Sequence, residues 1–343
     1  MADKQNRNYH IKHATTRKYK ATSKVKGMST KGKTWSETVL KRIAPRYVYR
    51  HDYMNPLLDP IKKIDPIIMA NIAGLFEGDG HASLRLVPND KSGSITGLAV
   101  VSIGLSDPEW PMIIGILFGV KVTKISFKKG TCKNGGTRKP LYYVNFTQTL
   151  ASIFLEQIIP FLRSDKLQDA LTIVRHFNPQ FTYETNTDMK YAVPWLSGFS
   201  EAEGSFRMKL VHSWKKFKKG RRKRAQYKVE YTLTNTEQDI LYYARNVMER
   251  AGLDMSHVYI KRDNRTNGIT ARERNAGHYK EAYLLAIRVA KNLVPLYHLL
   301  VPYMGMKRKI AAVDRTLDWF QLNDRLDRLG YTRKNGRGYG FKR

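Results

Sequence analysis

The chain has 343 residues, 42% of them hydrophobic, which is enough for one large domain or two of ordinary size. Lysine and arginine number 61 against 29 acidic residues, and the resulting net charge of +32 favours a polyanionic partner. The only cysteine, Cys132, cannot form an internal disulfide, and no Cys/His group has zinc-binding spacing. Apolar stretches reach about ten residues, too few to cross a bilayer. We therefore expect no membrane partner, with a basic membrane-surface protein as the second choice.

The first segment, residues 1–64, is predicted to be a basic extension that is disordered when free. Its first fifty residues hold 14 Lys/Arg and only two acids, Asp3 and Glu37. Such a segment cannot bury a core. We favour a nucleic-acid-binding arm over a cleaved targeting sequence, because lysine outnumbers arginine and the apolar residues form no clear helical face.

An internal repeat organises the rest of the chain. Residues 72–81 (IAGLFEGDGH) recur as residues 196–205 (LSGFSEAEGS), 124 positions later (196 − 72). Two strand-like stretches follow each copy, then a helical stretch that ends at a glycine, then further strands and a helix that reaches a proline. The sequence therefore predicts an α+β fold made by tandem, pseudo-symmetric duplication of an α-β-β-α-β-β-α unit.

The repeat sets the expected domains. The first spans residues 65–178, a linker covers 179–188, the second spans 189–322 with a basic loop at 214–224, and a basic tail covers 323–343. Because the duplication supplies both halves in one chain, we expect a monomer with internal pseudo-dimer symmetry.

Each repeated motif is predicted to be one helix of three to four turns. Pro66 and Pro194 are expected in first turns, with Asp65 as an N-cap, and Gly80 and Gly204 where the helices end. Small residues recur four apart within each helix and allow two backbones to approach closely. We therefore expect the two motif helices to pack together at Gly74, Gly78, Gly198 and Ala202.

The motif helices end in acids, Glu77 and Asp79 in one half and Glu201 and Glu203 in the other. A carboxylate at a helix C-terminus is unfavourable by up to about 1 kcal/mol, so its duplication in an acid-poor chain indicates a function. If the helices pack side by side, Asp79 and Glu203 lie close together and repel unless a cation lies between them. Oxygen ligands of this kind suit Mg²⁺.

At these residues the sequence resembles the LAGLIDADG family of homing endonucleases and intron maturases in its single-chain, two-motif form. The resemblance covers residues 65–322. It implies two antiparallel sheets that form a saddle over double-stranded DNA, with the motif helices at the interface. It also implies metal-dependent hydrolysis of phosphodiesters, with Mg²⁺ or Mn²⁺ held by Asp79 and Glu203 beside Gly78 and Ala202. Glu77 and Glu201 take the preceding acidic position, where support of the helix end is expected.

Family members also carry a basic residue shortly after the proline that precedes the last helix. Lys307, five residues beyond Pro302, occupies that place in the second half. In the first half the same offset from Pro160 falls on Asp165, and Lys166 stands next to it. The expected catalytic residues are therefore Asp79, Glu203, Lys307 and Lys166.

Nucleic-acid contacts are expected along the strands and at a hairpin tip. Polar side chains alternating on the sheets are candidates for base readout, and they are drawn from both faces of the strands. These are Arg85, Ser102, Tyr143, Asn145, Arg207, Lys209, Tyr231, Thr234 and Asn235. The run from 215 to 224 holds eight cations in ten residues, and we expect phosphate contacts from Lys215, Lys216, Lys218, Lys219, Arg221, Arg222, Lys223 and Arg224.

A second function is compatible with the same sequence. The basic arm, loop and tail would also suit an intron maturase or another protein bound to intron or ribosomal RNA. We favour the endonuclease, because a pure RNA binder gains nothing from an acidic pair at Asp79 and Glu203. The resemblance further implies an organellar setting, in a mitochondrion or chloroplast.

Overall fold

The structure is a computed structural model that describes residues 64–88, 95–127, 139–217, 220–263, 281–328, 331–333 and 339–341. For residues 87–88, 95–96, 209–227 and 290, and from 323 onward, it describes the backbone alone. Of the expected N-terminal extension, only Ile64 lies within the described residues. Among the described helices, none is both long and apolar enough to span a bilayer.

The first half follows the predicted order and adds one helix. Its elements are α4 (Pro66–Asp79), β1 (Gly80–Pro88), β2 (Ile95–Leu105), α5 (Glu109–Phe118), β3 (Val122–Ile125), β4 (Leu141–Thr147), α6 (Gln148–Ile158), the 3₁₀ turn η2 (Ile159–Phe161) and α7 (Lys166–Phe177).

The second half repeats the same order. Its elements are α8 (Met189–Glu203), β5 (Gly204–Phe217), β6 (Gly220–Asn235), α9 (Gln238–Arg250), β7 (Ile260–Arg262), β8 (Tyr283–Ile287), α11 (Ala290–Leu300), the 3₁₀ turn η4 (Val301–Tyr303) and α12 (Lys307–Arg328). A short antiparallel pair, β9 (Tyr331–Arg333) and β10 (Tyr339–Phe341), follows. Helix α12 thus continues six residues beyond position 322, where the second domain was expected to end.

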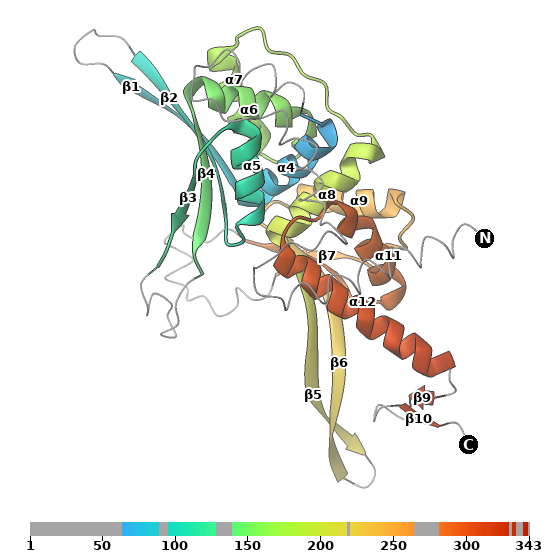
Figure 1. Ribbon diagram of the computed structural model, residues 1–343. Coiled ribbons are helices and arrows are strands. Elements are labelled where there is room, and N and C mark those ends of the chain that lie inside the picture. Colours follow the sequence, from blue (N-terminus) through green and yellow to red (C-terminus); the bar gives the residue numbers. More distant parts are fainter. Residues whose placement is uncertain are drawn as a thin grey trace.

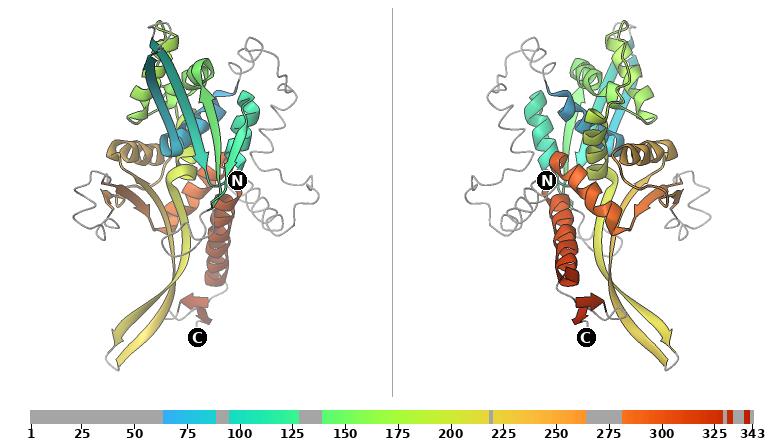
Figure 2. Two further views of the ribbon diagram at one scale, coloured as in Figure 1. Left: turned by 90° about the vertical axis from the view of Figure 1, so that its left-hand side faces the viewer. Right: turned by 90° about the vertical axis from the view of Figure 1, so that its right-hand side faces the viewer.

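The two halves have the same sheet topology, which confirms the predicted duplication. Each contains a four-stranded antiparallel sheet, ordered β1-β2-β4-β3 in the first half and β5-β6-β8-β7 in the second. The long hairpins β1–β2 and β5–β6 extend to opposite ends of the molecule, while α4 and α8 lie side by side at its centre (Figures 1 and 2). The motif helices therefore join the halves, as predicted.

Helices cover one face of each sheet, and the strand sequences alternate accordingly. In β2 the side chains of Ala99, Val101 and Ile103 are buried, whereas those of Val100 and Ser102 are more exposed. On this buried face a phenylalanine of β4 packs with aromatic rings from α4, α5 and α6. Four phenylalanines form this cluster, and two of them stack with ring centroids 4.2 Å apart; its members are Phe76, Phe118, Phe146 and Phe154.

The motif helices begin differently from each other. Pro66 is the first residue of α4, and the Asp65 carboxylate caps the helix by accepting from the Ile67 N–H at 2.9 Å, as predicted. Helix α8 instead begins at Met189, capped by Asp188. The prediction that Pro194 lies in a first turn is therefore wrong, because a cap one turn earlier extends the helix around this proline.

Small residues set the distance between α4 and α8. A Cβ atom added at Gly74 would lie 2.0 Å from the carbonyl oxygen of Trp195, and one added at Gly198 would lie 2.0 Å from that of Asn71. At Gly78 it would lie 2.3 Å from the Cβ of Ala202. Only glycine fits at the first two positions, so the helix backbones contact each other directly.

Candidate active site

The carboxylates of Asp79 and Glu203 lie at the adjoining ends of the two motif helices. Each is the last residue of its helix, and a glycine that opens the first strand follows each. The absent side chain of Gly78 leaves room for Glu203, whose Cγ lies 3.0 Å from the position of an added Cβ. Asp79 is exposed and Glu203 is partly buried. The pair therefore faces a surface that a substrate can reach.

The preceding acids, Glu77 and Glu201, are buried, with exposed fractions of 2% and 1%. Glu77 accepts hydrogen bonds from the backbone N–H groups of Arg163 and Ser164 and from the Ser164 hydroxyl. Glu201 accepts from the Gly305 N–H at 2.9 Å, from the Met306 N–H at 2.5 Å, and from the Trp110 indole at 2.5 Å. Each glutamate thus holds the turn that leads into the last helix of its half.

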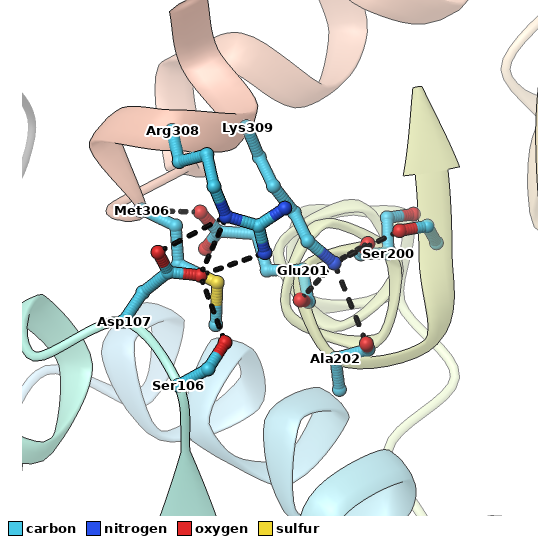
Figure 3. A network of polar contacts seen from close by, with 9 residues as sticks. Ser106, Asp107, Ser200, Glu201, Ala202, Met306, Arg308 and Lys309 are labelled. Carbon is cyan, nitrogen blue, oxygen red and sulfur yellow. Dashed lines mark hydrogen bonds and ion pairs between the residues drawn. The ribbon is translucent and has the colours of Figure 1, made fainter. Parts of the chain in front are cut away.

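A lysine ammonium caps the C-terminal end of each motif helix. Lys166 Nζ donates to the carbonyl oxygens of Phe76, Glu77 and Gly78 at 2.9–3.0 Å. Lys309 Nζ donates to the carbonyls of Ser200, Glu201, Ala202 and Gly204, two of them at 3.2 Å and 2.9 Å. Figure 3 shows Lys309 reaching from α12 to the end of α8. Each lysine satisfies carbonyls that the helix leaves unpaired and offsets the negative end of the helix dipole.

In the second half, the lysine that contacts the end of the motif helix is Lys309, two positions beyond the predicted Lys307. Lys307 is the exposed first residue of α12, whereas Lys309 is buried. In the first half, the predicted Lys166 itself contacts the end of the motif helix. The proline-to-lysine offset is six residues in the first half and seven in the second, so a constant offset of five could not identify either one. What the two lysines share is a structural feature: each ammonium group contacts the C-terminal end of its motif helix.

The electrostatic environment shifts the ionisation of all four groups. Loss of solvent and, second, the neighbouring charge of Asp79 together raise the pKa of Glu203 to about 7, while Lys166 and Lys309 oppose the shift. Loss of solvent also raises the pKa of Asp79, again against both lysines. Burial lowers the pKa of Lys166 and of Lys309. Two carboxylates and two cations therefore influence one another in a partly dehydrated site.

A hollow of about 270 Å³ opens beside this cluster. Glu203, Lys166 and Glu237 line it together with the end of β6. Its remaining lining consists of Glu77, Gly78, Thr234, Asn235, Thr236 and Ala282. The hollow thus contains groups from both halves of the molecule, with a carboxylate of one half facing a lysine of the other.

The donor set of Asp79 and Glu203 fits a hard divalent cation. Within the described part of the chain, no three His, Cys, Asp or Glu side chains form a group able to hold a metal. Two carboxylates are nevertheless enough for Mg²⁺, which keeps several waters and completes its shell with phosphate oxygens. The carbonyls of Gly78 and Ala202, the other expected contacts, accept hydrogen bonds from the two lysines. The metal set supported by the geometry therefore centres on the two carboxylates.

Most of the described readout candidates lie away from the helices. In the first sheet, Ser102 pairs with Asn145 and Tyr143 pairs with Gly104, on strand positions that alternate with the buried residues. Arg85 and Arg207 are exposed, and Thr234 is partly buried on the corresponding side of β6. These side chains can contact a ligand that lies against the sheets.

One candidate is wrong, because its side chain lies on the buried face of β6. Tyr231 is fully buried, and its hydroxyl lies 2.6 Å from the Ser200 hydroxyl. Asn235 accepts from the Glu237 N–H at 2.9 Å and so supports the start of α9. Tyr231 therefore cannot read bases, whereas Asn235 also lines the hollow and stays a candidate.

The expected basic hairpin is present in the backbone. Strands β5 and β6 pair continuously from Gly204↔Leu233 to Phe217↔Gly220, so Lys215 pairs with Arg222 and Lys216 with Arg221. Lys209 pairs with Lys228 in the same ladder, and Arg224 and Lys223 pair with Ser213 and Trp214. Lys218 and Lys219, at the tip, lie outside the described residues. The hairpin is about fourteen residue pairs long, as counted from this register.

Fold and site together define a pseudo-symmetric protein whose two central helices end in a shared acidic pair. No family model matches the chain, and no curated protein matches it. Similar solved structures include I-SmaMI bound to an uncleaved DNA target with calcium ions, at 16% identity and a TM-score of 0.43, covering 77% of this chain and 93% of that one. Another is I-LtrWI bound to target DNA, at 13% identity and a TM-score of 0.42, covering 75% and 92%. Both are LAGLIDADG homing endonucleases, the family that the two motifs resemble.

Proposed function

We propose that the chain is a site-specific double-strand DNA endonuclease of the LAGLIDADG type that hydrolyses phosphodiesters with a divalent metal. One observation carries the proposal: Asp79 and Glu203 meet at the ends of two directly packed helices, and a lysine stands behind each end. Two like charges at one surface favour a bound cation, and a chain with a net charge of +32 favours a polyanionic substrate.

The residues of the site have distinct roles in this proposal. Asp79 and Glu203 would hold Mg²⁺ or Mn²⁺, which supplies Lewis-acid chemistry at a phosphodiester. Lys166 and Lys309 fix the helix ends and place positive charge near the phosphate. Glu77 and Glu201 hold the turns that carry those lysines. The pseudo-symmetry supplies one lysine for each half-site, so each half-site would serve one DNA strand.

The sheets would provide binding and discrimination. Arg85 and Arg207 lie on strands that lead away from the acidic pair, and the β5–β6 hairpin extends this surface. Phosphate contacts of this kind position a protein on a duplex, whereas base contacts specify sequence. We therefore assign positioning to the basic hairpin and readout to polar residues such as Ser102 and Asn145.

The test is cleavage of a duplex that spans the insertion site of the gene for this chain. We expect the wild-type protein to cut both strands with Mg²⁺ or Mn²⁺ and to stop cutting when EDTA is present. Asp79→Asn and Glu203→Gln should each lower the rate at least about 100-fold without weakening DNA binding, because each removes a metal ligand and a negative charge.

The matched control for this test is Asp169→Asn, which removes an exposed acid from α7. It should cut at the wild-type rate. Cleavage by Glu203→Gln at that same rate would contradict the active-site assignment.

An RNA-binding role predicts a different order of ligands. At matched salt, an endonuclease should bind one duplex sequence more tightly than competing duplexes or folded intron or ribosomal RNA. A maturase or RNA-assembly protein should prefer the structured RNA. Tighter RNA binding together with no metal-dependent nicking would overturn the proposed function.

A further inference from the structure

An acid of the first half contacts the lysine-bearing helix of the second half. Asp107 lies two residues beyond the end of β2, and its carboxylate accepts from the Arg308 guanidinium at 2.8–3.2 Å. Arg308 immediately precedes Lys309, whose ammonium closes the end of α8. Figure 3 shows Arg308 and Lys309 diverging from one helix turn, one toward Asp107 and the other toward Ala202. The Asp107 side chain is only 14% exposed, whereas the Arg308 side chain is 52% exposed, so the carboxylate is the shielded partner of this bidentate contact.

An acid of the second half makes the corresponding contact in the other direction. Glu237 lies two residues beyond the end of β6, the strand that matches β2. Its carboxylate accepts from the backbone N–H of Asp165 at 2.9 Å. Asp165 immediately precedes Lys166, and Glu237 lines the same hollow as Lys166 and Glu203. The carboxylate therefore holds the start of α7 from across the interface.

The geometry points to Asp107 and Glu237 as positioning residues that each hold the lysine of the opposite half-site. The two acids occupy the same place in the repeat, and each contacts the residue directly before a lysine. Each half-site is thus assembled from both halves: the carboxylate end and the lysine come from one, and the acid that fixes the lysine comes from the other. This inference rests on the proposed function, because it assigns each acid to one strand of the substrate.

The two contacts differ in chemistry, which makes them separable. Asp107 pairs with a side chain, so Arg308 can be changed together with it. Glu237 accepts from a backbone amide, so only its own side chain can be changed. Glutamine at position 237 keeps an oxygen acceptor and loses the charge, whereas alanine loses both. The series Glu237→Gln and Glu237→Ala therefore distinguishes a positional from an electrostatic effect.

The experiment measures nicking of each strand of the cleavable duplex separately, under single-turnover conditions with the full chain. Glu237→Ala should slow about tenfold the strand that Lys166→Ala slows most, and should leave the other strand unchanged. Asp107→Ala should slow the strand that Lys309→Ala slows most. Glu237→Gln should recover most of the rate, and DNA affinity should remain unchanged. The matched control is Asp239→Ala, an exposed acid two residues further along α9.

Amide hydrogen exchange provides a second measurement that needs neither metal nor DNA. Glu237→Ala should accelerate exchange in the segment 163–168, which contains the Asp165 amide, and leave 305–310 unchanged. Asp107→Ala should do the reverse. A merely structural role would instead lower the free energy of unfolding and slow both strands equally.

The outcomes separate the two claims. Equal slowing of both strands, or unchanged exchange next to each lysine, would overturn the positioning role. A wild-type protein that cuts no duplex would overturn the proposed function, while the exchange measurement would still decide whether the two acids hold the helix starts.

Discussion

The two half-sites contain the same groups but bury their lysines to different extents. Lys309 has an exposed fraction of 7% and contacts four carbonyls of α8 and its C-cap. Lys166 is partly buried, contacts three carbonyls of α4 and lines the open hollow. The acids occupy matching positions in both halves, but the lysines are displaced by one residue relative to the preceding proline. What the duplication preserves is therefore the helix end and its ammonium cap, and the sequence offset is free to change.

The largest difference between the halves should appear when each lysine loses its charge. Lys309→Met leaves several buried carbonyls and the buried Glu201 without their cation, and should lower the free energy of unfolding by about 3–5 kcal/mol. Lys166→Met should cost about 1–2 kcal/mol, because water from the hollow can replace the ammonium. Urea unfolding of both variants tests this. Equal losses would show that the difference in burial has no energetic consequence.

The helix contact should respond in the same way in both halves. Gly74→Ala and Gly198→Ala each place a methyl group 2.0 Å from a backbone oxygen, so both should destabilise by about 3 kcal/mol through overpacking. Gly252→Ala is the control: its backbone φ of 89° is strained for alanine, but no atom lies within 4 Å of the added Cβ. It should cost about 1 kcal/mol. Thermal unfolding measures both losses. Clearly different losses of unfolding free energy in Gly74→Ala and Gly198→Ala would contradict the symmetric interface.

The acidic pair should make stability depend on pH in a defined direction. The pKa of Glu203 is raised from 4.5 to about 7 in the folded protein, so between these values the folded chain keeps a proton that the unfolded chain loses. The free energy of unfolding should therefore fall as pH rises from about 5 to about 7.5. Glu203→Gln should reduce that fall by up to about 2 kcal/mol, and Asp79→Asn should reduce it less because Asp79 is more exposed. Denaturant titrations in EDTA measure both, and a slope unaffected by Glu203→Gln would contradict the paired site.

The smallest expected effect concerns Tyr231, whose side chain lies on the buried face of β6. Tyr231→Phe removes one buried hydrogen bond with Ser200, so it should lower the free energy of unfolding by about 1 kcal/mol and leave DNA affinity and base preference unchanged. Ser102→Ala, on the other face of the equivalent strand, should change base preference without changing stability. A loss of discrimination in Tyr231→Phe would restore that residue as a reader of bases.

Much of the fold follows from local sequence signals that repeat. The duplicated motif predicts both helices, their contact at Gly74 and Gly198, and the strand order that follows. The prediction that Pro194 lies in a first helical turn is wrong because proline indicates a helix start only when no better N-cap precedes it. Asp188 is such an N-cap. The prediction for Tyr231 is wrong because both faces of β6 carry polar atoms, so alternation alone does not show which face of the strand is buried.

Site residues that belong to the repeated motif could be predicted from the sequence. Site residues that are selected by contacts between distant segments could not. Asp79 and Glu203 follow directly from the motif. The choice between Lys307 and Lys309 depends on how α12 is rotated against α8, and both neighbours of Arg308 are lysines. The contacts of Asp107 and Glu237 join residues 201 and 72 positions apart, and no local pattern indicates them.

The central claim is that Asp79 and Glu203 form one metal-holding pair at the DNA phosphates. The most direct test is a titration of paramagnetic Mn²⁺ into the complex with the preferred duplex, measured as bound ion by electron paramagnetic resonance. We expect tight Mn²⁺ binding by the wild-type complex, and marked weakening in both Asp79→Asn and Glu203→Gln but not in Asp169→Asn. Mn²⁺ binding that is equal in all four proteins would contradict the account.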